Sequence, residues 1–565
     1  MRKIFFAASL IFFLTVAFSV SADSVGEKRS FYIDPAYDLK KREELSAVLV
    51  KSVSGLYFYA DEDWWNFTSQ NRIYQALTEL EEEFSGNIYP KLSRTFGEEW
   101  RPGIDGEEAI TVLIHPMKES AGGYFRSNDE YAKVQISNSN QREMIYLNAE
   151  HIAGPLAKSF FAHELVHLIT FNQKENKNNV IEEVWLNELR AEYAPTLAGY
   201  DDNFENSNLE KRASDFKNNP SNSLIDWKSQ SSNYSVVNLF GHYLVSHYGL
   251  EILIDSLHSP LIGRESINYA LKENGFDKTF FDIFVDWIIA NLINDCGLGK
   301  EYCYLTSGLE NFKVNYKVNY LPFSGESALS LSDTTSAWTG NWYKIIGGEG
   351  RLKFEFSSSS DVGFKVPYVI VENSGNYKVN FLQINKKSKG QILVSDFGKD
   401  ISALFVMPIV AETEEERPFY FFSWTASIEK PKENPDLIKE LLAKIAQIKA
   451  EIAKTQAKIA AILASRNSGK PAPVPASHCS SITANLSYGQ NSQQVKCLQE
   501  FLKSQGADIY PEGLVTGYFG NLTKLAVIRF QERHSADILA PLGLNAGTGY
   551  VGISTRSKIN QLINY

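Results

Sequence analysis

Two histidines and a glutamate stand close together in the stretch FFAHELVHLITFNQ (160–173), as His163, Glu164 and His167. Residues four positions apart lie one turn apart on the same face of an α-helix, so both imidazoles could bind one metal ion. Glu164 could then reach a water molecule at the metal rather than the metal itself. The alternative is three polar residues on the outside of an ordinary helix. The flanking residues are apolar, however, and predict a buried helix in which unpartnered polar groups are costly.

A third ligand is needed because catalytic zinc keeps three protein ligands and one open position. The downstream stretch VWLNELRAEY (184–193) also predicts a helix, and it carries Glu188 and Glu192 one turn apart. We predict that Glu188 is the third ligand. Glu192 could accept a hydrogen bond from a ligand imidazole and so fix its tautomer. Taken alone, the two glutamates would also suit a solvated helix face.

The motif HELVH followed by WLNELRAEY resembles the gluzincin metallopeptidases, the group that contains thermolysin and the zinc aminopeptidases. HLITFNQK, GGYF and SNSNQREMIYLN are similar to the hyicolysin-type bacterial peptidases, and the resemblance covers residues 110–253. It implies a thermolysin-like α+β zincin domain in which His163, His167 and Glu188 bind Zn²⁺. Glu164 is then the general base, and the implied activity is hydrolysis of peptide bonds by a zinc-activated water.

The resemblance also implies a tyrosine or histidine, from a later helix, that donates a hydrogen bond to the oxyanion of the reaction. Tyr234 stands at the start of the predicted helix NYSVVNLFGHYLVSHYG (233–249) and resembles the tyrosine that opens this helix in the aminopeptidases. A core tyrosine is the alternative interpretation. The other candidate donors are His242, Tyr243 and His247, of which the two histidines do not share a helix face.

The sequence before His163 favours cleavage inside protein chains. The aminopeptidases carry a glycine-rich loop that binds the substrate amine, and we find no such motif upstream of this histidine. AGGYF (121–125) instead predicts an edge strand that pairs with an extended substrate backbone. We therefore expect an endopeptidase acting on proteins or peptides. The alternatives are hydrolysis of peptidoglycan stem peptides and a non-enzymatic adhesin or scaffold, although a decayed enzyme would usually have lost a ligand or the base.

The chain has 565 residues, too many for one compact core, and we expect several domains. ITVLIHP (110–116) and REMIYLN (142–148) predict strands, and helical patterns dominate residues 154–292. We place the metallopeptidase domain at residues 23–310. Short β-branched and aromatic runs separated by turn residues then predict a β-sandwich at residues 311–430, with no catalytic cluster.

A seven-residue repeat of isoleucine marks the next segment, residues 431–466. The repeated residues are Ile438, Ile445, Ile452 and Ile459. The repeat predicts a long helix that either forms a coiled coil, which would allow self-association, or packs on a neighbour as a lone amphipathic helix. SGKPAPVPAS then predicts an extended Pro-rich linker at residues 467–478.

The last segment reads LSYGQNSQQVKCLQEFLKSQG, then GLVTGYFGNLTKLAVIRFQERH, then GTGYVGISTRSKINQL. In order and spacing, residues 479–565 resemble the small all-α peptidoglycan-binding domain of bacterial cell-wall enzymes. The resemblance implies binding to peptidoglycan, and Tyr518 and Arg556 are the candidate contacts. A helical bundle without a glycan site is the alternative. The expected core residues are Leu498, Leu502, Val527 and Phe530.

The N-terminal residues predict export to the cell envelope. A positive MRK, a short apolar core and the small residues before Asp23 are typical of a cleaved signal peptide at residues 1–22. An uncleaved membrane anchor is the alternative; no other stretch is apolar enough to cross a membrane. Residues 23–54 could form an inhibitory propeptide. The net charge of −11 and the lack of a basic run argue against nucleic-acid binding.

The four cysteines agree with export to an oxidising compartment. They form two local pairs, Cys296 with Cys303 and Cys479 with Cys497. Neither pair has the Cys-x-x-Cys spacing of a zinc clip, so we predict two disulfides rather than a second metal site.

Overall fold

The computed structural model describes most of the chain, in two compact units, Met1–Asn434 and Pro435–Tyr565. The residues it describes are 23–53, 55–228, 230–322, 327–359, 362–410, 419–429, 435–466 and 480–563. The predicted signal peptide, the Pro-rich linker and Cys479 lie outside these residues. Within the described part of the chain, no helix is long and apolar enough to cross a membrane.

The first unit begins with a six-stranded sheet in the order β1-β2-β3-β4-β6-β5. The strands are β1 (Lys28–Tyr32), β2 (Glu44–Val53), β3 (Leu56–Asp61), β4 (Ile110–His115), β5 (Gly123–Phe125) and β6 (Met144–Asn148). β3, β4 and β6 are parallel and fully buried, which explains their continuous apolar runs. β5 pairs antiparallel with β6 and is the last strand of the sheet, so the predicted strands and edge strand are confirmed.

The first thirty residues after the predicted signal peptide belong to this sheet. β1 pairs with β2, and β2 pairs with β3. The buried carboxylate of Asp23 accepts a hydrogen bond from the Tyr59 hydroxyl (2.8 Å) and forms an ion pair with Arg142 (2.7 Å). Removal of this segment as a propeptide would leave Arg142 without this partner and expose the edge of β3. The segment is therefore a structural part of the fold.

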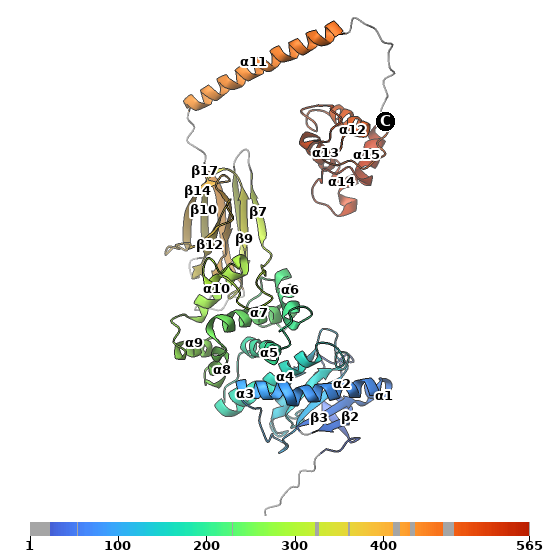
Figure 1. Cartoon of the computed structure of the whole chain (residues 1–565), viewed down its shortest axis with the longest axis vertical. Helices are drawn as coiled ribbons and strands as arrows, with labels where there is room; N and C mark the ends of the chain where they lie inside the picture. The colour runs from blue at the N-terminus through green and yellow to red at the C-terminus, as the bar shows by residue number, and fades with distance from the viewer. Residues whose placement is uncertain are drawn as a thin grey trace, which may run out of the picture. The chain divides into compact units, whose positions relative to one another are not determined.

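Three helices of the first unit lie between β3 and β4 in sequence, and from residue 157 onward helices dominate, as the pattern over residues 154–292 predicts. The helices are α1 (Glu62–Phe67), α2 (Gln70–Glu83), α3 (Tyr89–Phe96), α4 (Ala157–Phe171), α5 (Val184–Ala198), α6 (Asn208–Asn218), α7 (Ser231–Tyr248), α8 (Glu251–His258), α9 (Gly263–Glu273) and α10 (Phe280–Ile293). α4 is buried on almost every side and lies beside α5, which packs in turn on α7 (Figure 1). α5 ends at Gly199, whose φ of +87° is readily adopted only by glycine.

The structure confirms a β-rich region after residue 310, but nine of its strands form one connected sheet in a barrel-like arrangement rather than the two separate sheets of the predicted β-sandwich. The strands of this region are β7 (Lys317–Leu321), β8 (Ala328–Thr335), β9 (Tyr343–Gly347), β10 (Gly350–Ser358), β11 (Phe364–Lys365), β12 (Pro367–Glu372), β13 (Tyr377–Phe381), β14 (Lys389–Phe397), β15 (Ile401–Val406), β16 (Ile409–Val410) and β17 (Tyr420–Glu429). One group of strands runs β13-β12-β15-β9-β7 and another runs β14-β10-β17-β8. Only the pair Phe397 and Ile401 joins β14 to β15, and the two groups enclose one apolar core in a barrel-like arrangement.

The helices and the β-rich region share a continuous core. Trp338 and Trp342 are buried among residues of α10, where the Trp342 indole nitrogen donates to the Ile288 carbonyl oxygen (2.9 Å). The Trp338 carbonyl oxygen accepts from the backbone nitrogen of Leu224 (2.9 Å). The segments that the sequence divides near residue 310 therefore lie within one compact unit.

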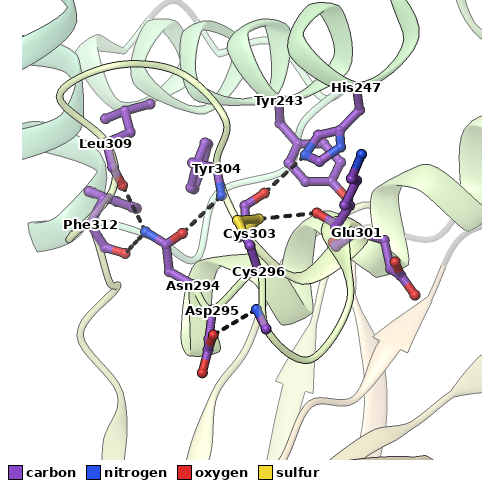
Figure 2. The surroundings of a disulfide bond; sticks show 12 residues. Tyr243, His247, Asn294, Asp295, Cys296, Glu301, Cys303, Tyr304, Leu309 and Phe312 are labelled. Atoms are coloured by element: carbon purple, nitrogen blue, oxygen red, sulfur yellow. Dashed lines mark hydrogen bonds between the residues drawn. A yellow bond between two sulfur atoms is a disulfide. The ribbon is translucent and has the colours of Figure 1, made fainter.

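One disulfide lies between α10 and the β-rich region. Cys296 and Cys303 are bonded, with their Cα atoms 5.0 Å apart, as predicted (Figure 2). Asn294, which ends α10 with φ of +42°, donates to the carbonyl oxygens of Leu309 and Phe312 and so fixes the same loop. Cys497 is also disulfide-bonded.

The second unit contains the predicted long helix, α11 (Pro435–Arg466). A small helical domain follows, formed by α12 (Gln493–Ser504), α13 (Asn521–Arg533), α14 (Ser535–Ile538) and α15 (Ile553–Ile563). The four core residues predicted for it are fully buried.

Candidate metal centre

The three predicted ligands meet between α4 and α5. One donor atom from each of His163, His167 and Glu188 lies within 4.8 Å of the others. Glu188 Oε2 is 3.2 Å from His163 Nε2 and 3.6 Å from His167 Nε2. The helical spacing places both imidazoles on one face of α4, and packing against α5 brings the carboxylate to that face.

An acceptor on the far side of each ring favours one histidine tautomer. His167 Nδ1 lies 3.0 Å from the Asn187 side-chain oxygen, and His163 Nδ1 lies 3.5 Å from a carboxylate oxygen of Glu192. Both partners are acceptors, which favour a proton on each Nδ1 and leave Nε2 as the nitrogen that could bind a metal ion. The two Nε2 atoms are 3.2 Å apart and face Glu188. This is the role that the sequence predicts for Glu192.

This donor set fits a divalent metal ion. Glu188 Oε2 is buried and lies between the two imidazole Nε2 atoms, and no other hydrogen-bond donor reaches it among the described residues. Burial lowers the pKa of His167, but the Glu188 and Glu164 carboxylates outweigh burial and raise the pKa to about 9. The centre therefore favours positive charge. Two imidazole nitrogens and one carboxylate oxygen are the ligands that catalytic zinc takes in proteins.

Glu164 lies next to the ligands and beneath the edge strand. A Cβ added at Gly123 would lie 2.9 Å from Glu164 Cγ and 2.5 Å from the Tyr146 carbonyl oxygen, so the glycine permits close approach of β5 to α4. Burial raises the pKa of Glu164, His163 and His167 lower it, and the resulting pKa is about 7. A carboxyl group with this pKa can accept and release a proton near neutral pH.

Glu192 is held by side chains from α6 and α7. The Arg212 guanidinium donates to it from Nε (2.8 Å) and from its terminal nitrogen. Asn208 and Asn238 donate to the same carboxylate at 3.1 and 3.3 Å. Burial raises the pKa of Glu192, but Arg212 outweighs it and holds the pKa below its usual range. No motif or spacing in the sequence marks these three positioning residues.

Tyr234 lies beside the ligands, near the start of α7. Its ring centre is 6.3 Å from that of His163, and it packs edge-on against Trp227 (4.8 Å). The Arg212 guanidinium lies 5.0 Å from the ring centre. Burial, followed by the Glu188 charge, raises the pKa of Tyr234 well above its usual value. The hydroxyl therefore keeps its proton and can act as a hydrogen-bond donor.

The other candidate donors on α7 have partners elsewhere. His242 is buried, and its Nε2 lies 3.2 Å from the Thr196 hydroxyl. His247 Nε2 lies 2.9 Å from the Cys303 carbonyl oxygen, and Tyr243 donates to a carbonyl oxygen of the same segment (2.7 Å; Figure 2). His247 and Tyr243 therefore bind the loop of the Cys296–Cys303 disulfide rather than the candidate metal centre.

Sequence reasoning missed Tyr37, which lies between β1 and β2. Its ring stacks on Tyr124 of the edge strand, with 4.6 Å between ring centres. Burial, and then the charges of Glu164 and Glu188, raise the pKa of Tyr37 to about 12. The loop that carries it is far from the zinc motif in sequence, and only the sheet brings it near the centre.

The candidate peptidoglycan contacts lie in the second unit. Tyr518 is 44% exposed, and Arg556 is half-buried on α15. Residues 491–559 match the family model of a putative peptidoglycan binding domain. The predicted domain is thereby supported, and it indicates association with the cell wall.

Other comparisons give no further relationship. The pre-peptidase C-terminal domain of a collagenase from Bacillus anthracis aligns with 20% of this chain and 95% of its own, at 8% identity and a TM-score of 0.15. A mitogen from Yersinia pseudotuberculosis aligns with 19% of this chain and 92% of its own, at 11% identity and a TM-score of 0.14. No curated protein sequence matches the chain. TM-scores this low identify no shared fold.

Proposed function

We propose that this protein is a secreted, cell-wall-associated zinc endopeptidase that hydrolyses peptide bonds in proteins, with a thermolysin-like zincin domain. The observation that carries the proposal is the convergence of His163, His167 and Glu188 around one point, with Glu164 beside them. The resemblance of both helices to gluzincin motifs supports the same assignment.

Each side chain around the centre has a role in this proposal. Zn²⁺ held by the three ligands would polarise a substrate carbonyl and lower the pKa of a water molecule. Glu164 would take the proton of the attacking water and pass it to the leaving amine. Tyr234, which keeps its proton, would donate to the developing oxyanion. Glu192 and Asn187 would keep both ligand rings in the binding tautomer.

The edge strand supports endopeptidase action. β5 is the last strand of its sheet and lies over Glu164, so an extended substrate that paired with it would pass the general base. A Cβ at Gly122 would lie 2.4 Å from the Phe160 ring, and one at Gly123 would meet Glu164. The two glycines thus let the strand lie directly on α4.

Secretion is supported by the signal-peptide pattern and by the disulfide at Cys296 and Cys303. The peptidoglycan-binding domain also favours a second candidate, in which the substrate is the peptide stems of the wall itself. A non-enzymatic adhesin would use the same domain, but it gives no reason for a complete set of ligands and base.

Self-association through α11 is part of the proposal. Ile445 (47%) and Ile452 (51%) of the isoleucine repeat lie exposed on this helix, and so do Leu441 (50%) and Ile448 (55%), which repeat at the same spacing. A second copy of the helix would cover them in a coiled coil. Sedimentation of the full chain should show an oligomer that Ile445→Ser together with Ile452→Ser disrupts; a wild-type monomer would contradict this part of the proposal.

Cleavage of unfolded casein by the mature chain, residues 23–565, tests the activity. Glu164→Gln should lower the rate by about a thousandfold, because it removes the proton acceptor, while zinc content stays unchanged. Glu150→Gln, at an exposed position, is the matched control and should keep full activity.

The alternatives give distinct results in the same experiment. Zinc-dependent release of peptides from peptidoglycan, without casein cleavage, would replace the protein substrate by the stem peptides. A zinc-free protein that cleaves neither substrate would contradict the enzyme and leave the adhesin.

A further inference from the structure

The side-chain amide of Gln499, on α12, organises the turn before α13. Its oxygen accepts from the backbone nitrogens of Thr516 and Gly517, each at 2.8 Å. Its nitrogen donates to the Tyr518 carbonyl oxygen (2.8 Å) and to the Thr523 hydroxyl (2.9 Å). The glutamine is 1% exposed, so this one side chain fixes the buried side of the turn.

The same arrangement occurs again 32 residues later. The Gln531 amide oxygen accepts from the Gly549 backbone nitrogen (2.9 Å). Its amide nitrogen donates to the Tyr550 carbonyl oxygen (2.8 Å) and to the Thr555 hydroxyl (3.0 Å). The sequence separations within each set are identical, at 18, 19 and 24 residues. The C-terminal domain is therefore built from two copies of one helix-and-turn unit.

Each copy presents one tyrosine in the same way. Tyr518 and Tyr550 are 44% and 45% exposed. A Cβ added at Gly520 would lie 3.5 Å from the Tyr518 ring, and one at Gly552 would lie 3.1 Å from the Tyr550 ring. Each ring thus lies against the glycine two positions later, and about half of its surface is open to solvent. Gly517 and Gly549, with φ of +81° and +72°, shape both turns alike.

We propose that Tyr518 and Tyr550 are two equivalent binding subsites for the glycan strand of peptidoglycan, one on each copy of the unit. The proposal rests on the wall association of this domain. A tyrosine ring offers an apolar face for the C–H side of a sugar ring and a hydroxyl for its polar groups. The two tyrosines are uncharged, which suits a neutral sugar better than a charged stem peptide.

Two subsites match the repeating chemistry of the ligand. A glycan strand repeats the same sugars along its length, so one strand or two neighbouring strands can engage both tyrosines. The second contact is then made at a high effective concentration, and affinity exceeds that of either subsite alone. Loss of one subsite should therefore weaken binding strongly without abolishing it.

Binding of the full mature chain to insoluble peptidoglycan sacculi tests the inference. Tyr518→Ala and Tyr550→Ala should each weaken binding by about tenfold, and the double variant by about a hundredfold or more. Tyr518→Phe and Tyr550→Phe keep the ring and should retain most of the affinity. Tyr488→Ala is the matched control, because Tyr488 is 56% exposed in the same domain but lies outside the repeated unit. Circular dichroism should show an unchanged fold for every variant.

Competition identifies the part of the wall that is bound. Soluble oligomers of N-acetylglucosamine should displace the protein from sacculi, and isolated stem peptides should not. Displacement by stem peptides alone would overturn the glycan assignment. Equal binding by Tyr550→Ala and Tyr488→Ala would overturn the second subsite. A wild-type chain that does not bind sacculi would instead contradict the wall association itself.

Discussion

The candidate metal centre and the two glutamine clusters of the C-terminal domain, Gln499 and Gln531 with their hydrogen-bond partners, bury polar groups to a similar depth. Gln499 and Gln531 are 1% and 2% exposed, and both ends of each amide have hydrogen-bond partners within their own domain. Glu164 and His167 are 5% and 7% exposed, and the donor atoms of the three candidate ligands converge on one point, with Glu188 Oε2 3.2 and 3.6 Å from the two imidazole Nε2 atoms. The polar atoms of each glutamine amide are thus paired within the fold, whereas the candidate ligands direct their donor atoms at one place.

Removal of the metal ion should produce the largest difference in stability between the first unit and the C-terminal domain. A ligand that binds only the folded state, and is present at a thousand times its dissociation constant, adds about 4 kcal/mol to the free energy of unfolding. Chelation should therefore lower the unfolding free energy of the first unit by about that amount and leave the C-terminal domain unchanged. Tryptophan fluorescence reports the first unit, because the last tryptophan is Trp424, and calorimetry reports both. Glu188→Gln should remove the effect; a chelator shift that persists in this variant would contradict the assignment.

Substitution of either glutamine should have the opposite effect: it should destabilise the C-terminal domain and leave metal binding unchanged. Gln499→Leu leaves the buried backbone N–H groups of Thr516 and Gly517 without an acceptor and should destabilise the C-terminal domain by about 3 kcal/mol. Gln531→Leu should have a similar effect, and neither variant should change zinc content. Gln493→Leu, at an exposed position on the same helix as Gln499, is the control. A calorimetric change below about 1 kcal/mol would show that these amides do not organise the fold.

Substitution of a residue that orients the candidate metal ligands should have a smaller effect, on zinc affinity. Arg212→Met leaves the buried Glu192 carboxylate without its charged partner and loosens the acceptor for His163. Zinc affinity should fall about 10- to 100-fold, measured by competition with a chromophoric chelator. Lys217→Met, on the exposed side of the same helix, should leave the affinity unchanged. Equal affinities for the two variants would contradict the positioning role.

The smallest expected effect is on the pH dependence of stability and comes from His115, a buried histidine of the first unit that lies outside the candidate metal centre. Burial lowers the pKa of His115 to about 4, although Asp38 opposes the shift. His115 therefore binds a proton at higher pH in the unfolded chain than in the folded protein. The stability that comes from its neutral form in the folded state is fully present above pH 6.5 and is lost as the pH falls toward 4. Between pH 6.5 and 5.5 the loss should be about 1 kcal/mol. His115→Gln should remove that part of the pH dependence in denaturant titrations; an unchanged pH dependence would contradict the assignment.

The sequence predicted which residues of the candidate metal centre come together where they share a helix or a motif. Helical periodicity alone places His163 and His167 on one face, and the second motif supplies Glu188. Arg212, which fixes Glu192, comes from a separate helix and is brought there only by tertiary packing. Tyr37 likewise reaches the centre through the sheet.

The fold was predicted where local patterns decide it and not where long-range packing does. Buried strands and the core of the C-terminal domain follow from continuous or periodic apolar residues. The core around Trp338, which joins the helices to the β-rich region, depends on segments far apart in sequence. The repeated TGY motifs were visible in the sequence, but their equivalence became clear only from the hydrogen bonds of Gln499 and Gln531.

Zinc content of the purified mature chain tests the central claim most directly. After dialysis against a weak chelator, elemental analysis should find one zinc ion per wild-type chain and one per Glu164→Gln chain, but almost none in Glu188→Gln. The proposal predicts this result because Glu188 would bind the metal ion and Glu164 would not. A wild-type chain without zinc, or equal zinc in the wild type and Glu188→Gln, would contradict the account.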